Sequence, residues 1–123
     1  MGSSGQGSPE ETRELANALD RLWERFLPEI RQRVAALESA AAAAAVGSLK
    51  KEQQAAAHET AHKLAGVLGT FGLADGTTQA REAELLYAPE ATPGPEHAEQ
   101  LASLARGLRA LIENRKRTQA QAN

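Results

Sequence analysis

The chain has 123 residues, enough for one compact domain and too few for two of ordinary size. Its formal net charge of -2 argues against a nucleic-acid-binding protein, and the absence of cysteine excludes disulfides and thiolate metal sites. No apolar run approaches the roughly 20 residues of a membrane span, and the N-terminus lacks the basic and apolar regions of a signal peptide. We therefore expect a cytoplasmic protein that neither binds nucleic acid nor inserts into a membrane.

The N-terminal third of the chain carries the signature of a long helical region after a short leader. Residues 1–8 are interpreted as a flexible leader or a cloning remnant. In "SPEE", Ser8 can cap a first helical turn, and Glu11 stands where a capping box places its carboxylate. Pro28 should kink this helix or end it and start another. Apolar residues repeat at helical spacing on both sides of Pro28, with Leu15, Leu19, Leu22 and Phe26 before it and Ile30, Val34, Leu37 and Ala41 after it.

Further helices follow, separated by glycine and proline. Gly47 should end one helix and Ser48 should cap the next, which we expect over about 49–71, with another over about 75–87. The proline-rich stretch "APEATPGP" predicts a loop. A last helix should start near Pro95 and bury Leu101, Leu104, Leu108 and Leu111.

No segment alternates with a period of two, so the predicted fold is all-α. We expect an antiparallel up-and-down four-helix bundle over residues 9–118, with a kinked or additional N-terminal helix. Residues 119–123 continue a polar stretch that we interpret as a tail or linker. The chain could accordingly be one part of a larger protein.

The expected helix over 49–71 contains the most informative residues. At about 100° per residue, His58, Gly66 and Gly69 fall within about 40° of His62 on the helical wheel, and Ala65 within about 60°. The apolar residues Ala57, Leu64, Leu68 and Phe71 fall on the far side and should face the core. Each glycine costs roughly 1 kcal/mol of helix propensity relative to alanine, so the pair should serve something other than local stability. We predict that His62 is exposed and surrounded by small residues, which lets a partner surface reach the imidazole.

This stretch, "HKLAGVLGTFGL", resembles the histidine-containing phosphotransfer (Hpt) domains of bacterial two-component phosphorelays. The family pattern is a histidine, then a leucine, lysine and glycine, then small residues and a glycine followed by a hydrophobic residue. The positions that agree are His62, Leu64, Gly66, Gly69 and the pair Gly72 and Leu73. The resemblance implies the same helical bundle and makes His62 the phosphoacceptor, with Lys63, Ala65, Gly66, Gly69 and His58 as docking or supporting residues.

The resemblance also implies a mechanism and partners. His62 would accept a phosphoryl group from the aspartate of a response-regulator receiver domain, or from a histidine kinase, and pass it to another receiver. The chain shows no phosphate-binding loop, acidic metal site or general base beside His62. We therefore expect a phosphotransfer carrier rather than an independent catalyst, with no cofactor or metal of its own and with Mg²⁺ on the partner receiver.

One position departs from the family pattern. The family lysine, three residues after the histidine, is thought to hold phosphate near the imidazole, and Ala65 stands in its place. Lys63 is present but points about 100° around the helix from His62. This departure puts the transfer rate in doubt and leaves the capacity of His62 to accept phosphate in place.

Two alternatives remain open at this point. "HETAH" fits a two-histidine zinc motif through His58 and His62, which would need a third ligand such as His97 or a carboxylate. The chain could instead be an Hpt-like docking module that has lost phosphotransfer together with the lysine.

Overall fold

The computed structural model describes residues 8–115. Residues 1–7, most of the expected leader, and the expected tail at 119–123 lie outside this range. The described residues contain four α-helices and one short 3-10 helix, and no strand, as predicted. The helices are α1 (Pro9–Ala45), α2 (Lys51–Thr70), α3 (Ala74–Leu86), η1 (Pro95–His97) and α4 (Ala98–Glu113).

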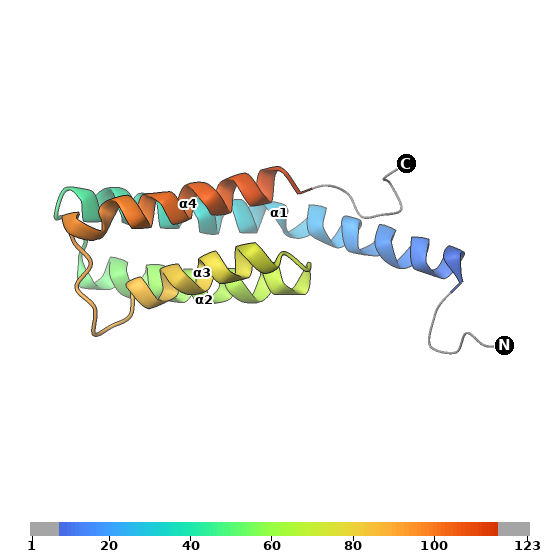
Figure 1. Cartoon of the computed structure of the whole chain (residues 1–123), viewed down its shortest axis with the longest axis horizontal. Helices are drawn as coiled ribbons and strands as arrows, with labels where there is room; N and C mark the ends of the chain where they lie inside the picture. Colours follow the sequence, from blue (N-terminus) through green and yellow to red (C-terminus); the bar gives the residue numbers. More distant parts are fainter. Residues whose placement is uncertain (1–7, 116–123) are drawn as a thin grey trace.

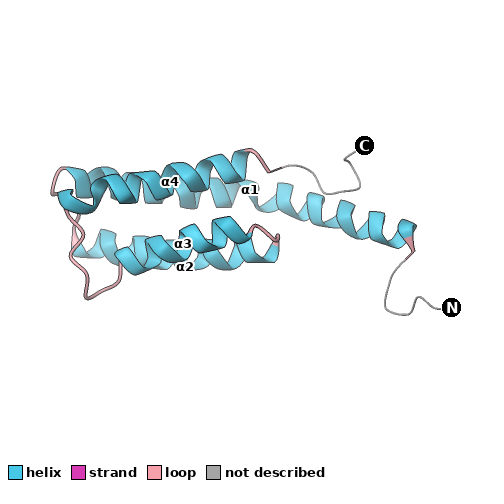
Figure 2. Cartoon of the chain, viewed as in Figure 1, coloured by secondary structure: helices cyan, strands magenta, loops and turns pink. Residues whose placement is uncertain are grey.

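The helices form an antiparallel up-and-down bundle in two layers. Figure 1 shows α1 and α4 side by side in one layer and α2 and α3 side by side in the other. Short turns join α1 to α2 and α2 to α3, whereas the longer loop before η1 carries the chain from α3 back to the first layer (Figure 2). Each helix therefore packs against the neighbour that precedes or follows it, and α4 closes the bundle against α1 and α3.

The first helix begins where the sequence predicts and does not stop at Pro28. Ser8 Oγ accepts a hydrogen bond from Glu11 N at 3.0 Å, and Ser8 N donates to Glu11 Oε1 at 3.2 Å, which completes the capping box. Helix α1 continues through Pro28 to Ala45, so of the two predicted outcomes, a kink or a restart, the restart with an additional N-terminal helix does not occur. Proline in a helix interior costs about 3 kcal/mol, and burial of Trp23 before it and Ile30 after it offsets that cost.

Both tight turns depend on a glycine in the left-handed region. Gly47 has a φ of 70°, and Ser48 N donates to Ala43 O at 2.8 Å, the hydrogen bond of a Schellman motif. Gly72, with a φ of 74°, ends α2 in the same way. The prediction that Ser48 caps the next helix is wrong, because α2 begins after Lys50 and the Ser48 hydroxyl instead donates to Ala43 O at 3.3 Å.

The core lies between the two layers and consists mainly of Leu, Ile, Val and Ala side chains. The expected stripes of α1 after Pro28 and of α4 are buried, except that Leu111 is only half-buried and Ile112 takes its place in the core. Alanine supplies much of the packing, since its small side chain lets the helices approach closely. The largest fully buried side chains of the core are those of Ile30, Val34, Leu64, Leu68, Tyr87 and Leu108.

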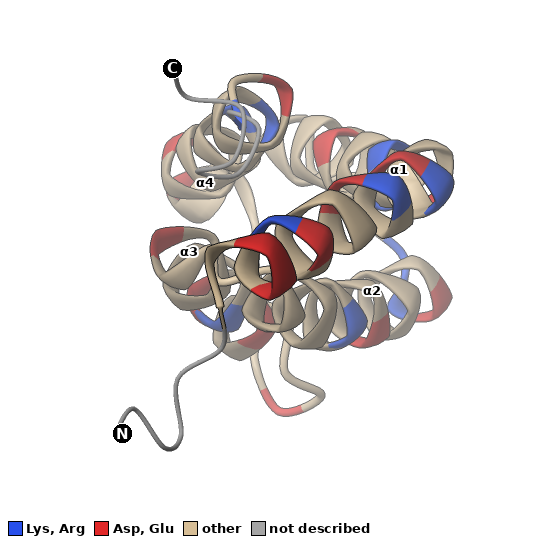
Figure 3. Cartoon of the chain, turned by 90° about the vertical axis from the view of Figure 1, so that its right-hand side faces the viewer, with Lys and Arg blue, Asp and Glu red and all other residues tan. Residues whose placement is uncertain are grey.

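The N-terminal part of α1 extends past the end of the bundle (Figure 1). Leu15 in this part is therefore 68% exposed, whereas the half-buried Leu19 still packs against the core. Where α1 rejoins the bundle, the Trp23 and Phe71 rings meet edge to face with centroids 5.1 Å apart, and the Arg115 guanidinium lies 4.9 Å from the Trp23 centroid. Figure 3 shows basic and acidic residues mixed along the projecting part of α1.

Candidate functional site

The middle of α2 presents His62 to solvent. The His62 side chain is 69% exposed, and Gly66 and Gly69 on the following turns are exposed as well. A Cβ atom at Gly66 would meet nothing within 4 Å. The prediction of an exposed imidazole beside glycines is confirmed. The bare backbone at Gly66 allows another surface to approach the imidazole closely.

The opposite side of α2 faces the core as predicted, with Ala57, Leu64 and Leu68 buried. Ala65 corrects the helical-wheel prediction, because it is only 3% exposed and does not belong to the open surface around His62. Its carbonyl oxygen accepts a hydrogen bond from Thr77 Oγ1 of α3 at 3.3 Å. Helix α3 covers the side of α2 that lies about 60° from His62, so a side chain at position 65 starts within the α2–α3 interface.

Lys63 does not substitute for the lysine that is missing at position 65. Its Nζ lies 3.3 Å from Glu59 Oε2, one turn earlier on α2, and both side chains are largely exposed. An exposed ion pair of this kind stabilises a helix by only a few tenths of a kcal/mol, about 0.3–0.5 kcal/mol. Lys63 is therefore a surface cation paired along its own helix.

Glu84 of α3 is the partner of His62 that the sequence analysis missed. His62 Nδ1 lies 3.0 Å from Glu84 Oε2, and the Glu84 side chain is only 21% exposed. A carboxylate oxygen accepts and does not donate, so the His62 Nδ1 atom carries the proton. In the neutral imidazole the lone pair is then on Nε2, which leaves Nε2 as the nucleophilic nitrogen.

The position of Glu84 follows from the turn between α2 and α3. In two antiparallel helices joined by a tight turn, residues at equal distances from the turn lie side by side. His62 precedes Leu73 by 11 residues (73 − 62), and Glu84 follows it by 11 (84 − 73). Pairing residues at equal distances before and after this turn would have identified Glu84 as the neighbour of His62.

His58 also contacts Glu84, through the main chain. Its Nδ1 lies 2.9 Å from the Glu84 carbonyl oxygen, and since that oxygen only accepts, His58 Nδ1 donates. Both histidines on this face of α2 are thus engaged with one residue of α3. Among residues 8–115 no group of three or more His, Cys, Asp or Glu residues is arranged to hold a metal ion, so the zinc alternative has no third ligand there.

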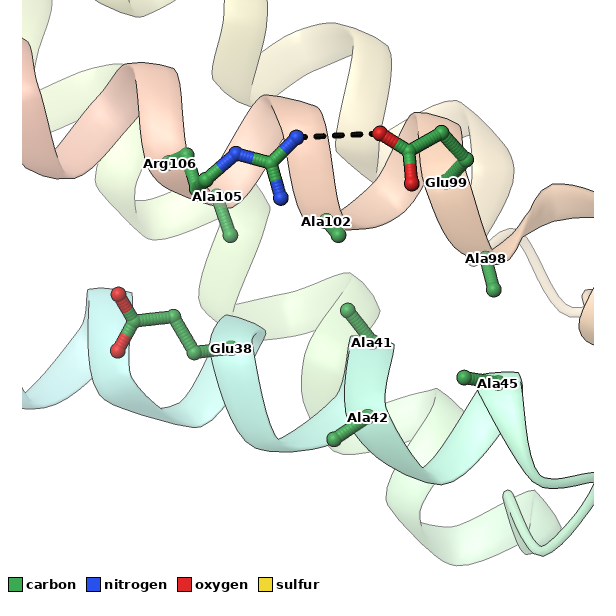
Figure 4. Close-up of a pocket in the computed structure, with 9 residues that line it drawn as sticks. All are labelled: Glu38, Ala41, Ala42, Ala45, Ala98, Glu99, Ala102, Ala105 and Arg106. Carbon is green, nitrogen blue, oxygen red and sulfur yellow. Dashed lines mark hydrogen bonds and ion pairs between the residues drawn. The ribbon is translucent and has the colours of Figure 1, made fainter.

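Two hollows differ in their chemistry. A shallow one beside His62 is lined by Ala55, His58, Glu59, His62 and Glu84, and so contains the imidazole pair. Figure 4 shows another hollow, between α1 and α4. Alanine methyl groups, including those of Ala41, Ala45 and Ala102, line it, and an ion pair joins Arg106 to Glu99. The residues that line this second hollow include no histidine. The α2 surface, with its exposed imidazole, is therefore the candidate site.

These features define a class of protein, a four-helix bundle that presents one exposed imidazole whose second ring nitrogen is held by a carboxylate. The family model for the Hpt domain matches residues 21–118, well over half of the chain. The chain therefore belongs to the Hpt domain family, whose members act in two-component phosphorelays. Comparisons with curated proteins and with solved structures found no match.

None of the described helices is long and apolar enough to cross a membrane.

Proposed function

We propose that His62 is the phosphoacceptor, and that the chain takes a phosphoryl group from a receiver-domain aspartate, or from a histidine kinase, and passes it to another receiver. The observation that carries this proposal is the pairing of an exposed imidazole with Glu84 through Nδ1. That pairing leaves the Nε2 lone pair available for attack, and the glycines of α2 leave room for a partner surface.

The transfer would proceed by nucleophilic substitution at phosphorus. The lone pair of His62 Nε2 forms the N–P bond while the bond from phosphorus to the aspartyl oxygen breaks, and the released carboxylate keeps that electron pair. The proton stays on Nδ1, so the ring gains positive charge as the bond forms. The Glu84 carboxylate, 3.0 Å away, would stabilise this charge, as a buried aspartate does for the histidine of a serine protease.

The same sequence in reverse would deliver the phosphoryl group to the next receiver. The described residues contribute the nucleophile, its orientation and an accessible surface, and Mg²⁺ would be supplied by the receiver. The chain would therefore act as a carrier, with catalysis shared between it and its partner. A docking module without phosphotransfer is the other candidate, suggested by Ala65, but the hydrogen bond between His62 and Glu84 favours a functional acceptor.

The direct test is acquisition of phosphate from a phosphorylated receiver or a histidine kinase. We expect label that is labile in acid and stable in alkali, the behaviour of a phosphoramidate. His62→Gln should abolish it and leave the thermal midpoint nearly unchanged, because the exposed imidazole contributes little to the core.

His97→Gln is the matched control, because His97 lies in η1 and is outside the proposed site. This variant should take up label as the parent protein does. Undiminished label in His62→Gln would contradict the proposal, and equal loss of label in both variants would show that the assay does not report on His62.

A further inference from the structure

Three polar side chains on α2, four residues apart, hold the C-terminal end of α3 and the loop that follows it. Gln54, His58 and His62 form this row, which we call the α2 polar row. Gln54 Nε2 lies within hydrogen-bonding distance of three main-chain oxygens, those of Tyr87 at 3.4 Å, Ala88 at 2.8 Å and Ala91 at 2.9 Å. His58 and His62 both bind Glu84, the first at its carbonyl oxygen and the second at its carboxylate.

The hydrogen bond from His58 satisfies a carbonyl group that the end of α3 leaves open. The last carbonyl groups of a helix have no partner within the helix. The two nearest main-chain donors are used elsewhere, since Tyr87 N donates to Ala83 O at 3.1 Å and Ala88 N donates to Leu85 O at 3.2 Å. The Glu84 carbonyl oxygen instead accepts from His58 Nδ1 at 2.9 Å.

Glu84 is consequently held at two points by two histidines one turn apart. The half-buried His58 fixes the main chain of Glu84, and the carboxylate then reaches His62 Nδ1. Without the first contact, the end of α3 could move relative to α2, and the carboxylate would be free to leave the imidazole. A His62 ring without that acceptor can carry its proton on Nε2, the nitrogen that has to attack phosphorus.

We infer that His58 is a positioning residue for phosphotransfer, which acts through Glu84 to keep the His62 proton on Nδ1. This inference rests on the proposed function of His62. The effect of His58 on the tautomer of His62 can nevertheless be measured without any partner protein. His58 takes no part in bond making. Its role is to hold the α3 end in register with the nucleophile.

The test compares His58→Ala with His58→Asn. Alanine removes the donor, whereas asparagine places an amide N–H near the position of the imidazole Nδ1 and can keep the hydrogen bond to the Glu84 carbonyl oxygen. In long-range ¹H–¹⁵N spectra of histidine-labelled protein, His62 should show the Nδ1–H tautomer in the parent and in His58→Asn. His58→Ala should show an increased fraction of Nε2–H at His62.

The rate of phosphate uptake is the second readout. By analogy with the outer partners of metal-bound imidazoles, His58→Ala should lower the initial rate roughly tenfold, and His58→Asn should restore most of it. Glu84→Ala should lower the rate at least as much and change the His62 tautomer in the same direction. The final label should stay on His62 in every variant.

The outcomes separate this inference from the proposed function. If His62→Gln abolishes label while His58→Ala keeps the parent tautomer and rate, the positioning role is refuted and the phosphoacceptor stands. If His58→Ala changes the tautomer while His62→Gln keeps its label, the proposed function fails and the structural coupling stands. Should His58→Ala not fold, a His58→Asn protein without the Nδ1–H tautomer at His62 would equally refute the inference.

Discussion

Tyr87, at the end of α3, combines complete burial with a hydroxyl group that no described residue binds. Burial disfavours the phenolate and raises the pKa of Tyr87 to about 12. The folded chain therefore keeps the proton to higher pH than the unfolded chain, whose tyrosine titrates near 10. The contribution of the neutral Tyr87 side chain to the free energy of unfolding is fully present below about pH 10. It is lost as the pH rises through about 12.

Since Tyr87 is the only tyrosine, its titration can be followed without interference from another phenol. We expect the tyrosinate absorbance of the folded protein to appear with a midpoint near 12, and that of the urea-unfolded protein near 10. A midpoint near 10 under conditions where far-ultraviolet circular dichroism still reports a folded bundle would contradict the burial of this side chain.

Single residues of the site were predictable to different degrees from sequence. The exposure of His62 and the burial of Leu64 and Leu68 follow from helical periodicity, a local property. The burial of Ala65 does not, because it depends on which side of α2 is covered by α3. Glu84 was missed for a similar reason, since its contact with His62 depends on the register of two helices, which no pattern within either helix specifies.

At the scale of elements, two helical glycines have opposite functions. A Cβ at Gly66 of α2 would meet nothing within 4 Å, whereas a Cβ at Gly76 of α3 would lie 2.9 Å from Leu68 Cδ1. Leu68 is completely buried and has little room to move. The absence of a side chain at Gly76 therefore sets how closely α2 and α3 approach, and at Gly66 it leaves the surface open.

The two alanine substitutions should consequently change stability in opposite directions. Gly66→Ala should stabilise the domain by up to about 1 kcal/mol through helix propensity. Gly76→Ala should destabilise it, because overpacking of a buried contact costs about 1–3 kcal/mol and exceeds the same gain in propensity. Urea denaturation of both variants measures the difference. Two changes of the same sign would show that the α2–α3 spacing is not limited by Gly76.

Helix α1 shows where local rules mislead. The capping box of Ser8 and Glu11 and the turn at Gly47 were predicted because they depend on residues within one turn of each other. Pro28 was expected to kink the helix, or to end it and start another, on the same local grounds. The helix continues because both sides of Pro28 pack against the bundle, and burial of distant contacts is not encoded in the residues next to the proline.

At the scale of the whole molecule, the order of the helices was predictable and their unequal lengths were not. Helix α1 has 37 residues, against 20 in α2 and 16 in α4. Leu15 follows the apolar spacing of a buried stripe, yet it is exposed because α1 extends past the helices that would cover it. Leu22 and Phe26 follow the same spacing, but they flank the buried Trp23 at the edge of the bundle and remain 37% and 38% exposed. Periodicity identifies an apolar face but does not identify what packs on it.

The proposed docking of a receiver on α2 can be tested separately from stability by the substitution Gly66→Leu. Because the space there is open, Gly66→Leu should leave the thermal midpoint unchanged or higher. Its side chain would stand one turn from His62, on the surface that a receiver would cover under the proposed function. Transfer from a phosphorylated receiver should slow markedly. Gly66 suits this test better than Gly69, because a Cβ at Gly69 would lie 3.4 Å from Thr77 Oγ1 and could change the packing of α3.

Ala110→Leu is the matched control, because Ala110 is exposed on α4 in the other layer of the bundle. Its transfer rate, measured in a stopped-flow assay, should equal that of the parent protein. Equal rates in Gly66→Leu and in the control would show that the receiver does not cover this turn of α2.

The edge-to-face contact of Trp23 with Phe71 and the hydrogen bond from Gln54 to the Tyr87 carbonyl oxygen have a spectroscopic consequence. Phe71 follows the last turn of α2, and Gln54 lies in its first turns. The only two strongly fluorescent side chains of the protein therefore mark opposite ends of the helix that carries His62. Fraying of one end of α2 should change the surroundings of the tryptophan, and fraying of the other end those of the tyrosine, in the unmodified protein and without an attached dye.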